Sequence, residues 1–156
     1  MKTKILTLLT VFILLAAPTA VMAAANTFTV NYNVQTTSFT VEITAPGQTT
    51  MNFTGKLGTT GIPPDGTSGG TVAWGKINNT GDTTLSFNIS APPNTGVTLN
   101  VSSNTGMSDG VTVTGTPASP TGWANIPGGS SANIFGKADF AAGAAKGSTT
   151  ATIGAT

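Results

Sequence analysis

The chain has 156 residues with no cysteine and no histidine, which excludes disulfide bonds, thiolate and imidazole catalysis, and the commonest zinc ligands. Its six basic residues are all lysines scattered along the chain, so the arginine clamps and basic stripes of nucleic-acid-binding proteins are missing. Without the first 23 residues, four lysines remain against five acidic residues, and a net charge of −1 does little to keep copies apart.

Residues 1–23 have the three parts of a secretory signal peptide. Lys2 and Lys4 precede an uncharged apolar run at 5–17, and the small-residue cleavage site lies at 21–23. The apolar run has 13 residues, fewer than the roughly 20 that a membrane-spanning helix needs. We therefore expect a secreted protein, extracellular or at the cell surface, that is not inserted in a membrane after signal removal.

Residues 24–37 are predicted to form an N-terminal strand and a hinge. Polar and apolar residues alternate strictly from 26 to 34, which is typical of a strand with one buried face. The alternation leaves open whether this strand completes its own sheet or is donated to a neighbouring molecule. The apolar face that would enter the sheet consists of Phe28, Val30, Tyr32 and Val34.

Residues 38–156 are predicted to form one β-sandwich domain. Short alternating stretches recur about every 10 to 12 residues, separated by turns rich in Gly, Pro, Asn and Asp, as is typical of antiparallel sandwiches. We expect an all-β, immunoglobulin-like or jelly-roll-like sandwich of about nine strands, the N-terminal strand included. The strands in this domain are predicted at 39–43, 51–53, 72–77, 85–91, 97–102, 111–113, 134–140 and 149–156.

Three features of the sandwich can be predicted more closely. The strands at 85–91 and 97–102 flank a Pro- and Gly-containing turn, which predicts a hairpin. Trp74 is expected to fill the core, and Gly75 to mark a bulge or a close backbone contact. Trp123 lies in a loop rich in Pro and Gly, where we expect it to be more exposed, either packed on the loop or serving as a surface contact.

The remaining polar residues do not indicate catalysis. The five acidic residues are far apart in sequence, and Asp65, Asp82 and Asp109 occur in turn contexts, so a pair of glycosidase-type carboxylates is not expected. No contiguous calcium-binding loop is present, although loops that meet in space remain an alternative source of a calcium site. We expect no enzyme activity, no catalytic residues, no metal site and no cofactor.

Four Asn-x-Ser/Thr sequons are candidate N-glycosylation sites. Three of the asparagines fall on the polar faces of predicted strands and one falls in a turn, so all four would face solvent. Alternation alone would place strand asparagines there, so the pattern permits attached glycans without requiring them. The acceptor residues are Asn52, Asn78, Asn88 and Asn100.

Two stretches resemble a known group of surface proteins. Residues 72–87 contain a strand, an Asn-x-Gly turn at 79–81 and a second strand, and residues 140–153 are similar to the last hairpin of bacterial and archaeal surface sandwiches. With an N-terminal strand directly after the signal, the chain resembles the subunits of TasA-type biofilm-matrix fibres and archaeal bundling pili. The resemblance implies that the N-terminal segment completes the sandwich of a neighbouring subunit, and it implies no catalytic residue.

Two functions follow as hypotheses. In the first, the protein is a structural subunit of an extracellular filament, and its partner is a further copy of itself, joined head to tail by donation of residues 26–34. In the second, residues 26–34 are the first strand of a self-contained secreted sandwich, whose outer face binds a glycan or a cell-surface partner. Binding of nucleic acid is not expected in either case.

Overall fold

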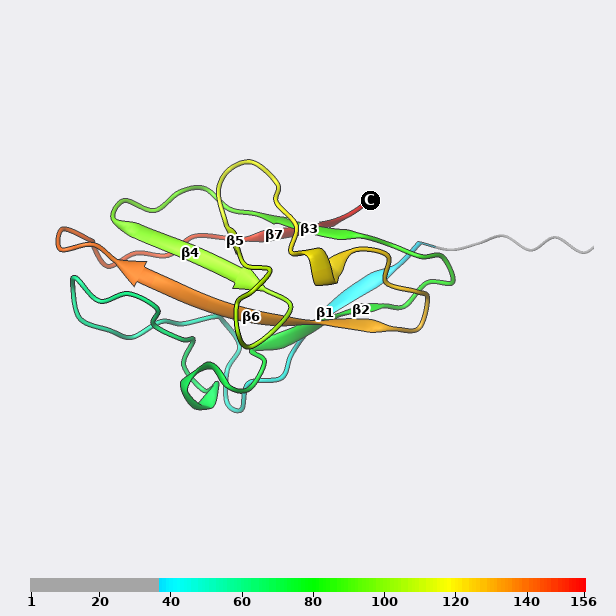
Figure 1. Ribbon diagram of the computed structural model, residues 1–156, viewed down its shortest axis with the longest axis horizontal. Coiled ribbons are helices and arrows are strands. Elements are labelled where there is room, and N and C mark those ends of the chain that lie inside the picture. The colour runs from blue at the N-terminus through cyan, green and yellow to red at the C-terminus, as the bar shows by residue number, and fades with distance from the viewer. Residues whose placement is uncertain (1–36) are drawn as a thin grey trace, which may run out of the picture. The chain divides into compact units, whose positions relative to one another are not determined.

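The computed structural model describes residues 37–156, which are all-β, with seven strands in two antiparallel sheets (Figure 1). The expected signal peptide and the strand at 26–34 lie outside the described residues. The five-stranded sheet has the order β1 (Phe39–Ile43), β2 (Gly75–Asn79), β6 (Ser131–Phe140), β4 (Val97–Ser102) and β5 (Val111–Thr112). The two-stranded sheet pairs β3 (Phe87–Ser90) with β7 (Thr152–Ala155). Two short 3₁₀ turns, η1 (Ser68–Gly70) and η2 (Thr121–Trp123), lie in connections.

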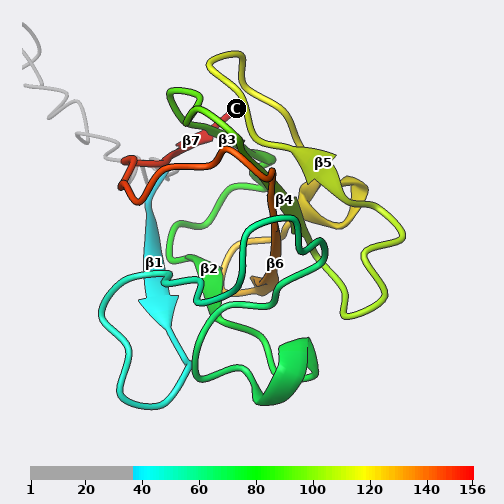
Figure 2. The same ribbon diagram turned by 90° about the vertical axis from the view of Figure 1, so that its left-hand side faces the viewer.

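Both sheets contribute side chains to one hydrophobic core. Phe87 from β3 contacts Phe39 from β1, with 5.2 Å between the ring centroids. Ile77 from β2 and Ile134 from β6 are buried in the same cluster. Figure 2 shows β3 and β7 across from β1, β2 and β6, with the core between them. Because successive strand residues point to opposite faces, the alternation in the sequence predicts which residues enter this core.

Seven of the predicted strands are present, and the one at 51–53 is wrong. Met51 and Phe53 are half-buried and Met51 packs against the core, but their backbone makes no ladder with a neighbour. The carbonyl of Asn52 instead accepts a hydrogen bond from the N–H of Asp65, within a long connection. The alternating burial of residues 51–53 therefore comes from a loop that packs on the core and does not form a strand.

The predicted hairpin of 85–91 and 97–102 is also wrong, because its two strands belong to different sheets. β3 pairs with β7 and bridges to Ala118, whereas β4 pairs with β5 and β6. The connection at 91–96 contains Pro92 and Pro93, and it carries the chain from one sheet to the other. Alternation shows which face of a strand is buried, but it does not identify the neighbouring strand.

Trp74 and Gly75 behave as expected. Trp74 is buried in the core. A Cβ on Gly75 would lie 2.6 Å from the backbone oxygen of Glu42, so any other residue would push β1 away from β2.

Trp123 requires a correction, because it is completely buried and not available as a surface contact. Pro120 precedes the η2 turn, which directs the indole into the core, and Nε1 donates a hydrogen bond to the carbonyl of Asn133 at 2.8 Å. A large aromatic ring whose N–H has a partner is stable in a core, whatever the composition of the loop that carries it.

Candidate functional site

The core face of β1 is incompletely covered. Phe39, Val41 and Ile43 point to the same side of the strand, and Phe39 and Ile43 pack against the core. Val41, between them, is 43% exposed. A valine in the middle of the buried face of a strand is normally covered by the opposite sheet. At this position, the two-stranded sheet does not reach over β1.

The same gap is bounded on its other side by β7. Ile153 packs against the core, whereas Ala155, two residues further along the same face, is exposed. We call the band between β1 and β7 the open strip, and its core-facing residues are Phe39, Val41, Ile43, Ile153 and Ala155.

Both strands beside the open strip have an edge with no partner among residues 37–156. Ser86 and Thr156 exchange backbone hydrogen bonds of 3.0 and 2.8 Å, so in an antiparallel ladder Ile153 and Ala155 direct their N–H and C=O groups away from β3. β1 forms its ladder with β2 alone among the described strands. Such edges are templates for a further strand.

The open strip is uncharged. The one charged side chain of β1, Glu42, lies on the opposite face, where it pairs with Lys76 of β2 at 3.3 Å. Hydrogen bonds from Asn78 and from Lys76 lower the pKa of Glu42. β7 has the sequence Thr-Ile-Gly-Ala and carries no charge. Exposed edges are usually protected by lysine, proline or inward-pointing charges, and β7 has none of these.

The open strip, which would accept the predicted strand at 26–34, was not evident from the sequence. Its expected donor residues, Phe28, Val30, Tyr32 and Val34, lie outside the described residues. The signal for the acceptor was weak, because Val41 and Ile153 look like ordinary core residues in an alternating pattern. The exposure of Val41 depends on how far the second sheet extends, which is a tertiary property.

The four sequons differ in their surroundings. Asn52 was expected on a strand, but it is exposed in the connection after β1. Asn78 was expected in a turn, but it lies on β2. Asn88 on β3 and Asn100 on β4 are half-buried, and Asn100 accepts a hydrogen bond from Thr112 Oγ1 at 2.8 Å. Glycosylation remains a prediction, and Asn52 is the most exposed of the four acceptors.

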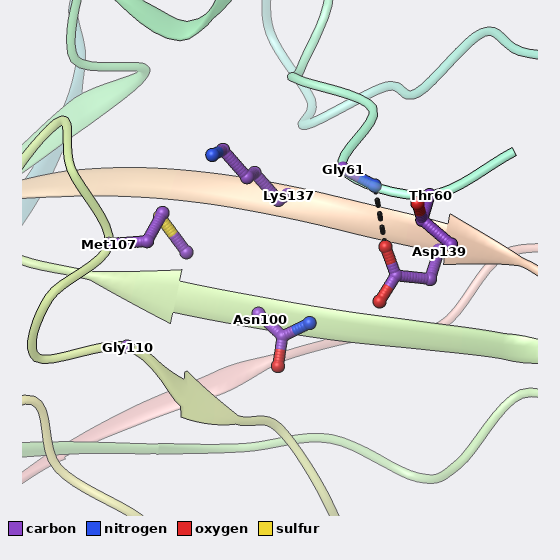
Figure 3. Close-up of a pocket in the computed structure, with 7 residues that line it drawn as sticks. All are labelled: Thr60, Gly61, Asn100, Met107, Gly110, Lys137 and Asp139. Atoms are coloured by element: carbon purple, nitrogen blue, oxygen red, sulfur yellow. Dashed lines mark hydrogen bonds between the residues drawn. The ribbon is translucent and has the colours of Figure 1, made fainter.

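A shallow hollow of about 370 Å³ lies over β4 and β6. Figure 3 shows Asn100 on β4 and Lys137 and Asp139 on β6 at its wall. Asp139 Oδ1 accepts a hydrogen bond from the N–H of Gly61 at 2.6 Å. This bond holds the connection between β1 and β2 against β6. The side chains that line the hollow include one carboxylate, that of Asp139.

Asp109 is the centre of a hydrogen-bond cluster that closes the connection between β4 and β5. It accepts bonds from the hydroxyls of Ser102 and Ser103, from Asn104 Nδ2 at 2.9 Å and from the N–H of Gly122 at 3.0 Å. Burial raises the pKa of Asp109, but the hydrogen bonds from Ser102, Ser103 and Gly122 outweigh it and lower the pKa from 3.8 to about 2. Both oxygens of this carboxylate accept hydrogen bonds that hold the loop together.

We expect Asp109 to make stability depend on pH. Its pKa is lower in the folded chain than in the unfolded one, so its stabilisation is complete above about pH 5 and is lost as the pH falls from about 4 toward 2. Because the group is partly exposed, we expect the contribution to be about 1–2 kcal/mol. Urea unfolding of the wild type and Asp109→Asn at pH 7 and pH 3 measures it. Equal losses on acidification in both proteins would contradict the prediction.

Within residues 37–156, no group of three or more acidic side chains lies where it could hold a metal ion. No helix in this part of the chain is long and apolar enough to cross a membrane. No family model, curated protein or solved structure matches the chain.

Proposed function

We propose that the protein is a structural subunit of a secreted extracellular filament, such as a pilus or a biofilm-matrix fibre. In this proposal the two sheets form an immunoglobulin-like or jelly-roll-like sandwich that lacks one strand, and residues 26–34 of a neighbouring copy supply it. The protein's partner is therefore itself, and its function is mechanical, without catalysis or a cofactor.

The observation that carries the proposal is the open strip. Val41 is 43% exposed on the core face of β1, beside an unpaired and uncharged edge of β7 among the described strands. A strand added there would gain main-chain hydrogen bonds and would cover apolar surface in the same step. Few surface features of a secreted domain offer both main-chain hydrogen bonds and apolar surface to a partner.

The donor segment suits this acceptor. Residues 26–34 alternate strictly, so Phe28, Val30, Tyr32 and Val34 would all point into the strip while the intervening Thr and Asn residues face solvent. Nine extended residues span roughly 30 Å, which is longer than either neighbouring strand. The low net charge of the chain without its signal also favours close association of many copies.

The second hypothesis, a self-contained module that binds a glycan or a surface partner, loses its candidate contact because Trp123 is buried. In that case residues 26–34 would cover the open strip of their own molecule. The protein would then remain monomeric, and this is the alternative outcome of the experiment below.

A pair of neighbouring substitutions tests the proposal by electron microscopy of the secreted protein. Val30 and Asn31 lie on opposite faces of the predicted strand, so Val30→Asp places a charge in the strip whereas Asn31→Asp places the same group in solvent. We expect filaments from the wild type and Asn31→Asp, and none from Val30→Asp or from a deletion of 26–34. Filaments from the deletion variant, or a wild type that stays monomeric when concentrated, would refute donor-strand assembly.

A further inference from the structure

A row of three polar side chains crosses the five-stranded sheet on its outer face. Asn100 on β4 lies in register with Lys137 on β6 and with Thr112 on β5. The next residues along the two longer strands, Val101 and Ala138, are completely buried. Because successive strand residues point to opposite faces, the row lies on the side of the sheet that is turned away from the core and from the open strip.

The side-chain amide of Asn100 is held by its oxygen alone. Oδ1 accepts the hydrogen bond from Thr112 Oγ1 at 2.8 Å, and Nδ2 has no hydrogen-bond partner among residues 37–156. In two other sequons, Nδ2 of Asn52 and of Asn78 already donates to a neighbouring side chain. Asn88 lies over the glycine of β7 and does not line the hollow. An N-linked glycan replaces one hydrogen of Nδ2, so Asn100 can carry one without losing a hydrogen bond.

The hollow over β4 and β6 begins at Asn100. In Figure 3, Asn100 lies between Met107 on one side and Asp139 and Thr60 on the other. Its volume of about 370 Å³ is within the range of roughly 300–1,000 Å³ that is usual for sites of small organic ligands. A second hollow of about 350 Å³ shares Thr60 and Asp139 with the first and extends to Thr98. The two hollows form one groove along the strands.

The polar groups of this groove match the hydroxyl groups of a saccharide. Lys137 forms no ion pair within the part of the chain that the structure describes. Asp139 uses Oδ1 for the N–H of Gly61, and Oδ2 has no partner among the same residues. An ammonium group donates and a carboxylate oxygen accepts, whereas the hydroxyls of Thr60 and Thr98 do both. Sugar hydroxyls also donate and accept, so an oligosaccharide can use all of these groups.

The third residue of the sequon indicates when a glycan would be attached. Ser102 is completely buried, and its hydroxyl donates to Asp109. A transferase that recognises Asn-x-Ser must reach this hydroxyl together with the amide of Asn100. The folded domain prevents that, so attachment to Asn100 has to precede folding of β4, during export.

We propose that Asn100 carries an N-linked oligosaccharide whose first sugars lie in the hollow over β4 and β6, in contact with Lys137 and Asp139. The glycan would cover the outer face of the sheet with a fixed, hydrated layer. Since this face is opposite to the open strip, the proposal is independent of the filament. It also distinguishes Asn100 from the other three sequons, which have no hollow beside them.

Release of the glycan from the folded protein tests where the sugars lie. The full chain is secreted by a eukaryotic host that attaches oligomannose glycans, and mass spectrometry of its peptides gives the occupancy of each sequon. Peptide:N-glycosidase is then added without denaturant. We expect release from Asn100 to be roughly tenfold slower than from the exposed Asn52, the difference that one or two hydrogen bonds to the first sugars would make.

Two lysines on the outer face supply a matched pair of variants. Lys137→Ala removes a group from the hollow, whereas Lys76→Ala removes the same group from β2, outside the hollow. We expect Lys137→Ala to speed release from Asn100 several-fold and Lys76→Ala to leave it unchanged, with circular dichroism confirming the fold of both. Secreted protein without a glycan on Asn100 would overturn the proposal. Release that is equally fast from Asn52 and Asn100, or equally affected by the two lysine variants, would overturn the placement in the hollow.

Discussion

Replacing Val41 by aspartate is expected to abolish the proposed filament assembly without unfolding the domain. Val41 is 43% exposed in the single subunit, so the carboxylate can remain in water there. In the filament the same position would be covered by the donated strand, and an unpaired charge would be buried next to Phe39 and Ile43. Burying even a neutral polar group without a partner costs about 2–7 kcal/mol, so we expect the critical concentration to rise roughly 100-fold or more.

A matched control is available at Val72, in the loop before β2. Val72 is 44% exposed, so Val72→Asp makes the same chemical change at equal exposure but outside the open strip. Sedimentation and electron microscopy measure assembly, and circular dichroism confirms the fold of both variants. Assembly that is lost equally in the two variants, or in neither, would contradict the role of Val41.

The second large effect that we expect is a loss of folding stability when Trp123 is replaced. Trp123→Ala removes a completely buried indole from the core, and truncations of this kind cost about 3–5 kcal/mol. Trp123→Phe keeps an aromatic ring but loses the hydrogen bond from Nε1 to the Asn133 carbonyl, so we expect a smaller loss of about 1–3 kcal/mol.

Urea denaturation followed by tryptophan fluorescence and circular dichroism measures both variants, with Trp74 as the remaining fluorophore. The expected order of stability is wild type, then Trp123→Phe, then Trp123→Ala. A change of less than about 1 kcal/mol in Trp123→Ala would be incompatible with a core role. Retained stability combined with lost binding to a glycan would instead support the surface-contact hypothesis.

Among the strands that the sequence predicted correctly, β3 and β4 show long alternation with one buried face. β3 and β4 could be located from alternating residues alone, because burial of one face imposes a period of two on the residues. Their partners could not be located in this way. Residues 92–96 looked like a hairpin turn, yet the chain uses them to change sheets.

Buried polar groups were the least predictable. Asn79 looked like a turn residue, but it is buried, and its Nδ2 donates to the carbonyls of Thr83 and Ile126 at 2.7 and 2.9 Å. Asp109 was interpreted as a simple turn former, although its carboxylate accepts hydrogen bonds from Ser103 earlier in the same loop and from the N–H of Gly122. Ile126 and Gly122 are distant in sequence from Asn79 and Asp109, so no local pattern reveals these two contacts.

The sequence by itself determined the all-β class, the faces of the strands and the absence of histidine and cysteine chemistry, because composition and period-two alternation are local properties. Only the tertiary structure decided that Trp123 is buried, that β3 and β4 lie in different sheets, and that Val41 is uncovered beside the free edge of β7. These features depend on which strands become neighbours and on how far the second sheet reaches over the first. That outcome is set by packing across the whole core.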